Sequence, residues 1–349
     1  MEKIRLGKTE MMVTRIGFGG IPIQRVSEDE AIAVVNKCLE LGINFLDTAN
    51  GYTTSEERIG KAIRGRREKI MLATKSLSRN REEIAKHLKL SLERLSTEYI
   101  DLYQFHNVSD KNTLKIILDP SGPRAVVEEA HKAGIVKHIG ISCHQIDVAK
   151  EAVQSNCFET ILFPLNFLAY EGSDELLSLA RQHDVGFIVM KPLAGGMIDD
   201  ASVAIKYLLQ KFPDVLIIPG IEKVPEIEEI VRIVEGPWQM TTADKKKMKQ
   251  IRLELGTRFC RRCDYCQPCT TGIPISDVMS FPNLAKRLPP VRLYTGKFAE
   301  SFEKALNCND CGECEERCPY KLPIRDMMKE HIKMHETGKK EYEARLSSR

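Results

Sequence analysis

The sequence lacks the features that would place it in a membrane or outside the cell. No stretch of its 349 residues approaches the roughly 20 apolar residues of a membrane span, and no secretory signal core opens the chain. It also lacks an excess of one charge, because 52 Lys and Arg against 49 Asp and Glu leave a formal net charge of +3. Such a balance does not favour nucleic-acid binding. We therefore expect a soluble, cytoplasmic protein with no membrane and no nucleic-acid partner, and its length predicts two domains.

Cysteine is also scarce through most of the chain. Cys38, Cys143 and Cys157 stand alone in apolar surroundings, which is typical of buried packing residues. The other eight cysteines form two compact runs near the C-terminus: Cys260, Cys263, Cys266 and Cys269, then Cys308, Cys311, Cys314 and Cys318.

The spacing within these runs indicates iron–sulfur clusters. The second run, NCNDCGECEERCPY, matches C-x2-C-x2-C-x3-C-P, which binds a 4Fe–4S cluster in bacterial ferredoxins. In that pattern the fourth cysteine of a run ligates the other cluster. The first run, FCRRCDYCQPC, departs from it, with two residues before its last cysteine and Thr270 in place of proline. The predicted ligand sets are Cys260, Cys263 and Cys266 with Cys318, and Cys308, Cys311 and Cys314 with Cys269.

Zinc and disulfides are the alternative explanations of the two runs. Structural zinc sites prefer two separated C-x2-C pairs, and disulfides need an oxidising compartment. Two 4Fe–4S clusters agree better with a triple C-x2-C ladder that occurs twice. The sequence therefore predicts a protein that transfers single electrons.

Before the cysteine runs, strand and helix patterns alternate. Eight short runs are strand candidates: RIGFGG, INFLDTA, KIMLATK, IDLYQFH, VKHIGIS, TILFPLN, GFIVMKP and VLIIPG. Helices between them are expected to begin at Ser27, with Glu30 completing a capping box, at Asn80 and at Ser173. Eight such units predict an α/β protein with a (β/α)8 TIM barrel, and a doubly wound sheet is the alternative.

These patterns divide the chain into three parts. Residues 1–237 are expected to form the barrel, with the hairpin KIRLGKTEMMVT turning at Gly7 and Lys8 over its bottom. Residues 238–256 are expected to form a linker helix. Residues 257–349 are expected to form a C-terminal, mainly helical, ferredoxin-like domain with two 4Fe–4S clusters.

The ends of three neighbouring strand candidates carry reactive side chains. FLDTANGY, LATKS and YQFHN place Asp47, Tyr52, Lys75 and His106 at the barrel edge where reacting groups lie. A lysine ammonium lowers the pKa of a tyrosine, ordinarily about 10, and a paired aspartate keeps the lysine charged. A neutral histidine can orient a carbonyl oxygen that receives the tyrosine's proton. The four residues therefore predict proton transfer to a carbonyl group.

These motifs resemble those of the aldo-keto reductases across roughly residues 3–235. FLDTANGY, LATKS, DLYQFHN, GISCH, VMKPLAGG and IIPGIEKV carry the resemblance, and the cysteine runs narrow it to the subgroup with a C-terminal ferredoxin-like domain. The resemblance implies Tyr52 as general acid, Lys75 and Asp47 as the groups that tune it, and His106 as the residue that orients the substrate. It also implies NAD(P)H across the barrel mouth.

The resemblance extends to candidate cofactor residues. It implies that Ser142 contacts the nicotinamide carboxamide and that the loop from Gly220 to Lys223 holds the phosphates. Asn166 is the amide nearest to the position where the family commonly has a glutamine, and Met190 replaces a stacking aromatic.

The expected phosphate loop also carries acidic residues. Glu222, Glu226 and Glu229 would repel the 2′-phosphate of NADP(H), and Lys223 would offset part of that repulsion. The sequence therefore does not predict a preference for NADP(H).

Together these observations predict an oxidoreductase that interconverts a carbonyl and an alcohol and exchanges electrons with two 4Fe–4S clusters. Hydride transfer moves two electrons whereas each cluster passes one. A flavin would bridge that difference, but no sequence motif indicates one. The expected partners are a small carbonyl or alcohol substrate and a redox protein. The alternative is an electron-transfer or assembly subunit whose barrel is a retained scaffold.

Overall fold

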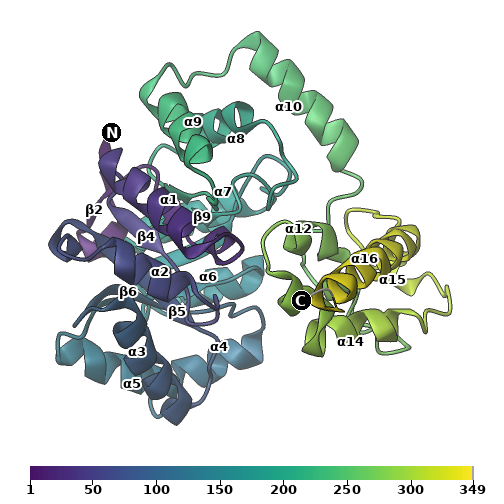
Figure 1. Ribbon diagram of the computed structural model, residues 1–349, viewed down its shortest axis with the longest axis horizontal. Coiled ribbons are helices and arrows are strands. Elements are labelled where there is room, and N and C mark those ends of the chain that lie inside the picture. Colours follow the sequence, from purple (N-terminus) through teal and green to yellow (C-terminus); the bar gives the residue numbers. More distant parts are fainter. Residues whose placement is uncertain (348–349) are drawn as a thin grey trace. The chain divides into compact units, whose positions relative to one another are not determined.

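Parallel strands form a closed barrel in the computed structural model, which describes residues 1–347 (Figure 1). The strands pair in chain order, and parallel bridges from Ile16 to Ile217 and from Gly19 to Gly220 join the last strand to the first. A doubly wound sheet would reverse its strand order partway, so the predicted (β/α)8 barrel is confirmed. The strands are β3 (Phe18–Gly19), β4 (Phe45–Asp47), β5 (Met71–Ser76), β6 (Ile100–Phe105), β7 (Val136–Ser142), β8 (Thr160–Pro164), β9 (Gly186–Met190) and β10 (Leu216–Ile218).

Helices alternate with these strands and cover the outside of the barrel (Figure 1). The predicted capping box at Ser27 and Glu30 and the predicted cap at Asn80 are confirmed. The predicted cap at Ser173 is wrong by one residue, because Gly172 adopts a left-handed φ of 75° and becomes the N-cap itself. The helices are α1 (Glu28–Glu40), α2 (Ser55–Ala62), α3 (Arg81–Leu95), α4 (Lys111–Leu118), α5 (Pro123–Lys132), α6 (Ile146–Gln154), α7 (Ser173–Gln182), α8 (Ala201–Lys211) and α9 (Val224–Glu235).

The N-terminal hairpin closes the bottom of the barrel. Strands β1 (Lys3–Arg5) and β2 (Met12–Thr14) pair antiparallel, as the sequence predicts. The turn needs glycine at position 7, because φ is 54° there and a Cβ would lie 2.2 Å from the backbone N of Gly186. The hairpin thus packs directly against the start of β9.

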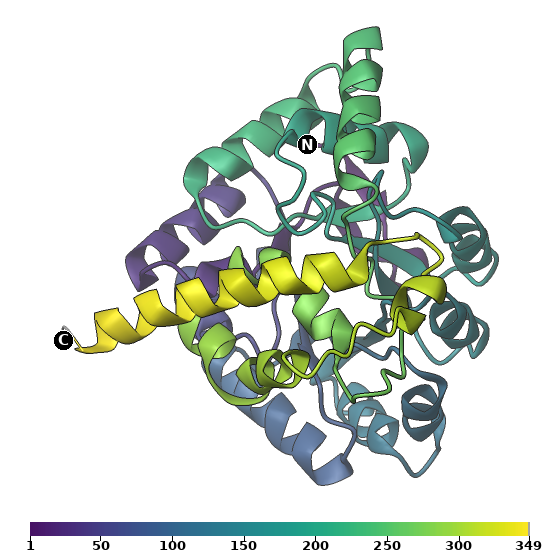
Figure 2. The ribbon, with the colours of Figure 1, turned by 90° about the vertical axis from the view of Figure 1, so that its right-hand side faces the viewer.

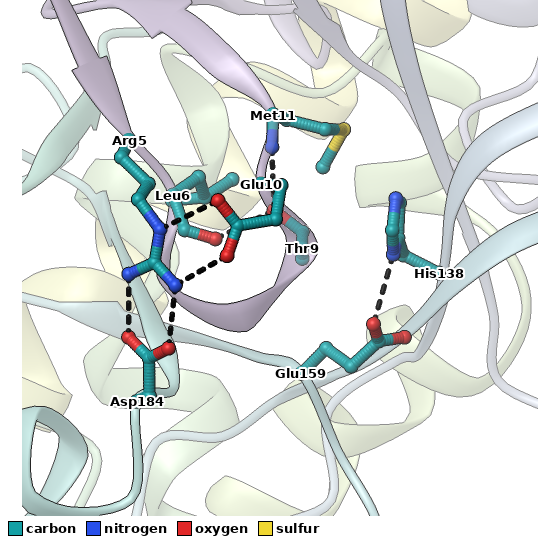
Figure 3. Close-up of polar contacts among 8 residues, drawn as sticks. All are labelled: Arg5, Leu6, Thr9, Glu10, Met11, His138, Glu159 and Asp184. Atoms are coloured by element: carbon teal, nitrogen blue, oxygen red, sulfur yellow. Dashed lines mark hydrogen bonds and ion pairs between the residues drawn. The ribbon is translucent and has the colours of Figure 1, made fainter.

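Ion pairs fasten this hairpin to the barrel (Figure 3). The Arg5 guanidinium donates to the Asp184 carboxylate at 2.8 and 2.6 Å and to Glu10 Oε2 at 2.9 Å. Hydrogen bonding to Arg5 lowers the pKa of both carboxyl groups. At the same end of the barrel, Nδ1 of His138 on β7 lies 2.8 Å from Oε1 of Glu159, the residue before β8. These contacts belong to the end of the barrel opposite the strand ends that carry the predicted site.

An apolar cluster fills the barrel between the hairpin and the upper strand ends. Its members come from the hairpin and from alternate positions of the strands, which face inward. They are Leu6, Met11, Val13, Phe45, Ala73, Leu102, Leu162, Ile188, Leu216 and Ile218.

The chain divides into two compact units. One comprises Met1–Ala194 with Ile198–Asp244, and the other comprises Gly195–Met197 with Lys245–Arg349. The helices that follow the barrel are α10 (Thr242–Leu255), α11 (Ile275–Met279), α12 (Phe281–Ala285), α13 (Pro290–Tyr294), α14 (Gly296–Ala305), α15 (Glu313–Glu316) and α16 (Ile324–Ser347).

The long helix α16 organises the C-terminal unit, where Figure 2 shows it in yellow. Met327 and Met328 face a core that includes Val278, Phe281 and Phe302. Within residues 1–347, no helix combines the length and apolarity needed to cross a membrane.

Candidate functional site

A polar layer lies above the barrel core, at the C-terminal ends of the strands. Asp47, Lys75 and Gln104 each follow a core residue of their strand by two positions. Because alternate strand residues face the same side, these three side chains also point into the barrel. The strand pattern therefore positions the polar groups without help from loops.

A buried ion pair forms the centre of this layer. Lys75 Nζ lies 2.5 Å from Asp47 Oδ2 and 2.7 Å from the carbonyl oxygen of Thr48. The amide of Gln104 donates to the other Asp47 oxygen at 3.0 Å. The side chains of Lys75 and Asp47 are only 2% and 5% exposed. Lys75 is thus held in one orientation by Asp47 and by the Thr48 carbonyl oxygen, and Gln104 in turn holds Asp47.

Burial and charge act against each other on this pair. Burial alone would lower the pKa of Lys75, but the charge of Asp47 and hydrogen bonds to Asp47 and Tyr52 raise it above its usual value. Burial raises the pKa of Asp47, and the charge of Lys75 opposes that rise. Lys75 therefore stays protonated over the whole neutral range.

Tyr52 brings a phenol to this ammonium group from the loop between β4 and α2. Its hydroxyl is hydrogen-bonded to Lys75, and Lys75 Nζ lies 5.1 Å from the centre of its ring. The ring meets His106 edge-on, with the ring centres 5.7 Å apart. The structure therefore brings together all four residues that the sequence predicts as the reacting set.

His106 supplies a neutral ring beside the tyrosine. Burial, together with the charges of Lys75 and Arg79, holds the pKa of His106 well below its usual value. Arg79 also donates to the His106 carbonyl oxygen at 2.6 Å, which fixes this part of the loop. The Nδ1 atom of His106 is buried and has no hydrogen-bond partner among the described residues. A neutral imidazole in this position can bind an oxygen atom of a ligand.

The predicted nicotinamide contacts occupy other strand ends. Ser142 is buried at the end of β7, and its hydroxyl accepts a hydrogen bond from Asn107 N at 2.8 Å. Met190 ends β9 and packs against the apolar cluster. The Asn166 side chain bonds to the backbone of Lys191, Leu168 and Ala169, so it braces a loop. Both the oxygen and the nitrogen of the Asn166 amide therefore already have backbone partners.

The loop after β10 is organised by its own carboxylate. Glu226 Oε2 accepts hydrogen bonds from the backbone N of Glu222 at 2.9 Å and of Lys223 at 3.1 Å, at the N-terminus of α9. The Glu222 carboxylate lies 3.6 Å from Arg25. Gly220 stands against Pro22, where a Cβ would approach to 2.9 Å. The backbone N–H groups that would suit a phosphate are therefore bound to Glu226.

Sequence reasoning missed Gln104 and the capping role of Glu226. The position of Gln104, two residues before His106 on β6, is a signal that it also points inward. Glu226 follows Pro225 at the third position of α9, where a glutamate commonly caps a helix.

In the C-terminal unit, eight cysteines surround two cavities. One, here called the Cys308 cavity, is lined by Cys269, Cys308, Cys311 and Cys314. The other, the Cys260 cavity, is lined by Cys260, Cys263, Cys266 and Cys318. Each cavity thus receives three cysteines from one run and the last cysteine of the other run.

The thiols differ in their surroundings. Burial raises the pKa of Cys260 to about 11 and of Cys266 to about 12. At Cys269 burial acts in the same direction, but hydrogen bonds from Thr271 and from neighbouring backbone N–H groups outweigh it and lower the pKa. The Cys308 cavity also has Arg325 in its wall, and the buried Nε of that residue has no hydrogen-bond partner among the described residues.

All eleven cysteines are free thiols. Within residues 1–347, no three His, Cys, Asp or Glu side chains form a group that could hold a single metal ion.

Comparison with known proteins identifies relatives of the barrel. A model of the Aldo/keto reductase family matches residues 15–202. The uncharacterized oxidoreductase YqkF of Bacillus subtilis (strain 168) is 30% identical over 236 residues, which cover 61% of this chain and 74% of that protein. L-galactose dehydrogenase of Arabidopsis thaliana is 29% identical over 214 residues, which cover 56% of this chain and 66% of that protein.

Solved structures show the same barrel. The holo form of an aldo-keto reductase from Bacillus halodurans aligns with a TM-score of 0.62 and 26% identity, over 72% of this chain and 96% of that one. An aldo-keto reductase from Klebsiella pneumoniae in complex with NADPH aligns with a TM-score of 0.61 and 19% identity, over 73% and 95% of the two chains. At that identity the second likeness concerns the fold alone.

Proposed function

Because the chain belongs to the aldo/keto reductase family of oxidoreductases, we propose that its barrel interconverts a carbonyl and an alcohol with a nicotinamide cofactor. The observation that carries this proposal is the buried Lys75, hydrogen-bonded to both Asp47 and Tyr52. A phenol beside a permanently charged ammonium group can donate a proton at neutral pH. The substrate class that fits is a small aldehyde or ketone, or the corresponding alcohol.

Residues of the barrel supply the proton and stabilise the charge that its transfer leaves behind. In the direction of reduction, a bound nicotinamide would supply the hydride for the carbonyl carbon. Tyr52 donates its hydroxyl proton to the carbonyl oxygen, and Lys75 stabilises the phenolate that remains. Asp47 keeps Lys75 charged and in place, as its 2.5 Å contact supports. His106, neutral because of its lowered pKa, holds the carbonyl oxygen by a hydrogen bond.

For the cofactor, we propose NAD(H) in preference to NADP(H). The residues at the mouth suit a nicotinamide: Ser142 is buried at a strand end, and Met190 gives an apolar surface. The N-terminus of α9 does not suit a 2′-phosphate, because Glu226 already accepts hydrogen bonds from its backbone N–H groups. Glu222 adds a second negative charge, which its ion pair with Arg25 offsets in part.

For the C-terminal unit, we propose two 4Fe–4S clusters, one at each cysteine cavity. The supporting observation is that the eight thiols separate into two sets of four, each drawn from both runs, which is the ligand exchange of two-cluster ferredoxins. Arg325 lines the Cys308 cavity, and its Nε has no hydrogen-bond partner among the described residues, although its other nitrogens bond to Glu315 and Asp310. A cationic side chain there suits an anionic cluster. Bound clusters would supply one-electron transfer to a redox protein.

Coupling between the two units requires a change in electron number. A hydride carries two electrons and each cluster accepts one. The proposal therefore needs a group that accepts a hydride and releases electrons singly, which is the chemistry of a flavin. Extraction of the anaerobically purified protein, followed by analysis for flavin and nicotinamide, tests this requirement directly.

The experiment that tests the barrel reaction is anaerobic turnover. Purified protein is mixed with NADH or NADPH and a panel of small aldehydes and ketones, and oxidation of the nucleotide is followed. We expect carbonyl-dependent oxidation of NADH. Intact clusters with neither nucleotide binding nor turnover would instead favour the scaffold alternative.

A further inference from the structure

The two cysteine cavities contain turns that allow an internal comparison. Each cavity receives one cysteine from the other run, and that cysteine begins a turn. The backbone N of Gly272 donates to the Cys269 carbonyl oxygen at 3.0 Å, and the backbone N of Lys321 donates to the Cys318 carbonyl oxygen at 3.1 Å. Each turn therefore contains an equivalent hydrogen bond, but the two residues that follow the cysteine differ between the turns.

The turn at Cys269 carries two hydroxyl groups. Thr271 Oγ1 lies 3.4 Å from Cys269 Sγ, and Thr270 Oγ1 lies 3.8 Å from Cys311 Sγ. Two of the four sulfurs around the Cys308 cavity thus have hydroxyl groups beside them.

The turn at Cys318 has different chemistry at the corresponding positions. Pro319 follows the cysteine and has no backbone N–H to donate. Tyr320 comes next, and the Arg261 guanidinium lies 3.7 Å from the centre of its ring. The position that corresponds to Thr271 is therefore occupied by Tyr320, whose ring contacts Arg261.

Hydrogen bonds to ligand sulfurs and solvent exposure help to set the reduction potential of an iron–sulfur cluster. A reduced cluster carries one more negative charge than an oxidised one, so a donor directed at its sulfurs stabilises the reduced form more. Exposure to water acts in the same direction. Each cavity has one buried cysteine, Cys314 or Cys318, but only the Cys308 cavity also has an exposed one, Cys311.

On this basis we propose that the cluster at the Cys308 cavity has the higher reduction potential, and that the Thr271 hydroxyl raises it. The inference rests on the proposed function, because it requires both clusters. One electron added to the protein would then reside at the Cys308 cavity: this cluster is reduced by one electron, and no bond is made or broken. The second electron would enter the Cys260 cavity at a lower potential.

An electron paramagnetic resonance titration of the full-length, anaerobically purified protein tests the proposal. Dithionite, with mediators, is the reductant. In wild type we expect two one-electron steps. In Thr271→Val the upper step should move to lower potential and the lower step should stay. The change should shift the one-electron equilibrium by up to about tenfold, which is about 59 mV.

Three further variants make the result specific. Thr271→Ser keeps a hydroxyl and should restore the wild-type upper step. Thr337→Val, on α16 at a hydroxyl that bonds to the Lys333 carbonyl oxygen, makes the same chemical change elsewhere and should move neither step. Cys311→Ser alters a ligand of the Cys308 cavity and should perturb the upper step alone.

The possible failures are distinguishable. Wild-type protein without iron and sulfide would overturn the proposed clusters, and this inference with them. Two clusters whose potentials are unchanged in Thr271→Val, or a shift of the lower step, would overturn this inference alone. If Thr271→Val lost a cluster, Thr270→Val would replace it, with the same expected direction and a smaller shift because of its longer contact.

Discussion

The barrel mouth and the cysteine unit place their reactive groups by different means. Asp47 and Lys75 belong to strands, and each is fixed by the register of a parallel sheet and by hydrogen bonds to its neighbours. The cysteines, apart from Cys314 in α15, lie on segments without helix or strand. The first arrangement is stabilised by the protein alone, whereas the second gathers thiols that a metal centre would cross-link. Ligand binding that occurs only in the folded state contributes its free energy to folding.

The largest expected effect comes from removing the proposed iron, which should destabilise the C-terminal unit and leave the barrel stable. Anaerobic treatment with an iron chelator should make the C-terminal unit sensitive to protease, because the thiols then lose their common ligand. The barrel, held by its own core, should keep its thermal transition within about 2 °C, less than the change that 1 kcal/mol produces in a domain of this size. Limited proteolysis and calorimetry measure both outcomes.

Matched cysteine variants provide the control for metal removal. Cys311→Ser should reproduce part of the effect of the chelator, and Cys157→Ser, at a cysteine outside both runs, should not. Equal loss of both units in the chelated protein would mean that the barrel does not fold independently of the metal.

The next effect concerns the barrel alone. Tyr52→Phe keeps the ring and removes the proton that passes to the substrate, so carbonyl turnover should fall by about 10²–10⁴-fold. NADH affinity, measured by fluorescence, and the iron content should both stay unchanged. Tyr99→Phe, just before β6 at the other end of the barrel, is the matched control. Near-normal turnover by Tyr52→Phe would remove the catalytic role from the predicted set.

A smaller effect concerns the choice of nucleotide. Glu226→Gln keeps an oxygen that can accept from Glu222 N and Lys223 N but loses the negative charge. The ratio of NADPH to NADH affinity should rise by about tenfold, which corresponds to about 1.4 kcal/mol. Glu229→Gln makes the same change one turn along α9 and should alter the ratio less. A wild-type preference for NADPH of a hundredfold or more would contradict the proposed role of this loop.

The smallest effect is a pH dependence of the C-terminal unit. His331 and His335 are buried on α16, and burial lowers the pKa of both. In the unfolded chain they bind protons near their ordinary pKa of about 6.5. The unfolded state therefore binds more protons as pH falls below that value, and the free energy of unfolding should decrease.

Linkage limits the size of this pH dependence. Each histidine can contribute at most about 1.4 kcal/mol per pH unit. Denaturant titrations between pH 8 and pH 5.5, compared with the His331→Gln/His335→Gln variant, measure the slope. An unchanged slope in that variant would rule out these histidines as its source.

The difference between residues fixed by strands and residues on loops explains which features the sequence could predict. All eight strands could be predicted, because short β-branched runs bounded by Gly, Pro and polar residues indicate strands of a buried parallel sheet. That the candidate catalytic residues lie together could be predicted, because Asp47, Lys75 and His106 stand at the ends of neighbouring strands. Predicting that Gln104 joins Asp47 would have needed the inward face of β6 as well as its end.

The loops were less predictable, because their side chains bond to backbone groups that are distant in sequence or depend on where a helix begins. Asn166 is an example: its Nδ2 donates to the carbonyl oxygen of Lys191 at 3.0 Å, across 25 residues. Glu226 is another, because its role as a cap depends on α9 starting at Val224. Neither contact follows from hydrophobic periodicity, which describes helices and strands.

The central claim is that a carbonyl-reducing barrel is joined to a unit that holds two 4Fe–4S clusters. Iron and acid-labile sulfide in the anaerobically purified, full-length protein test it most directly. The account predicts about eight irons and eight sulfides per chain, the content of two four-iron clusters. Stoichiometric zinc without sulfide would contradict it.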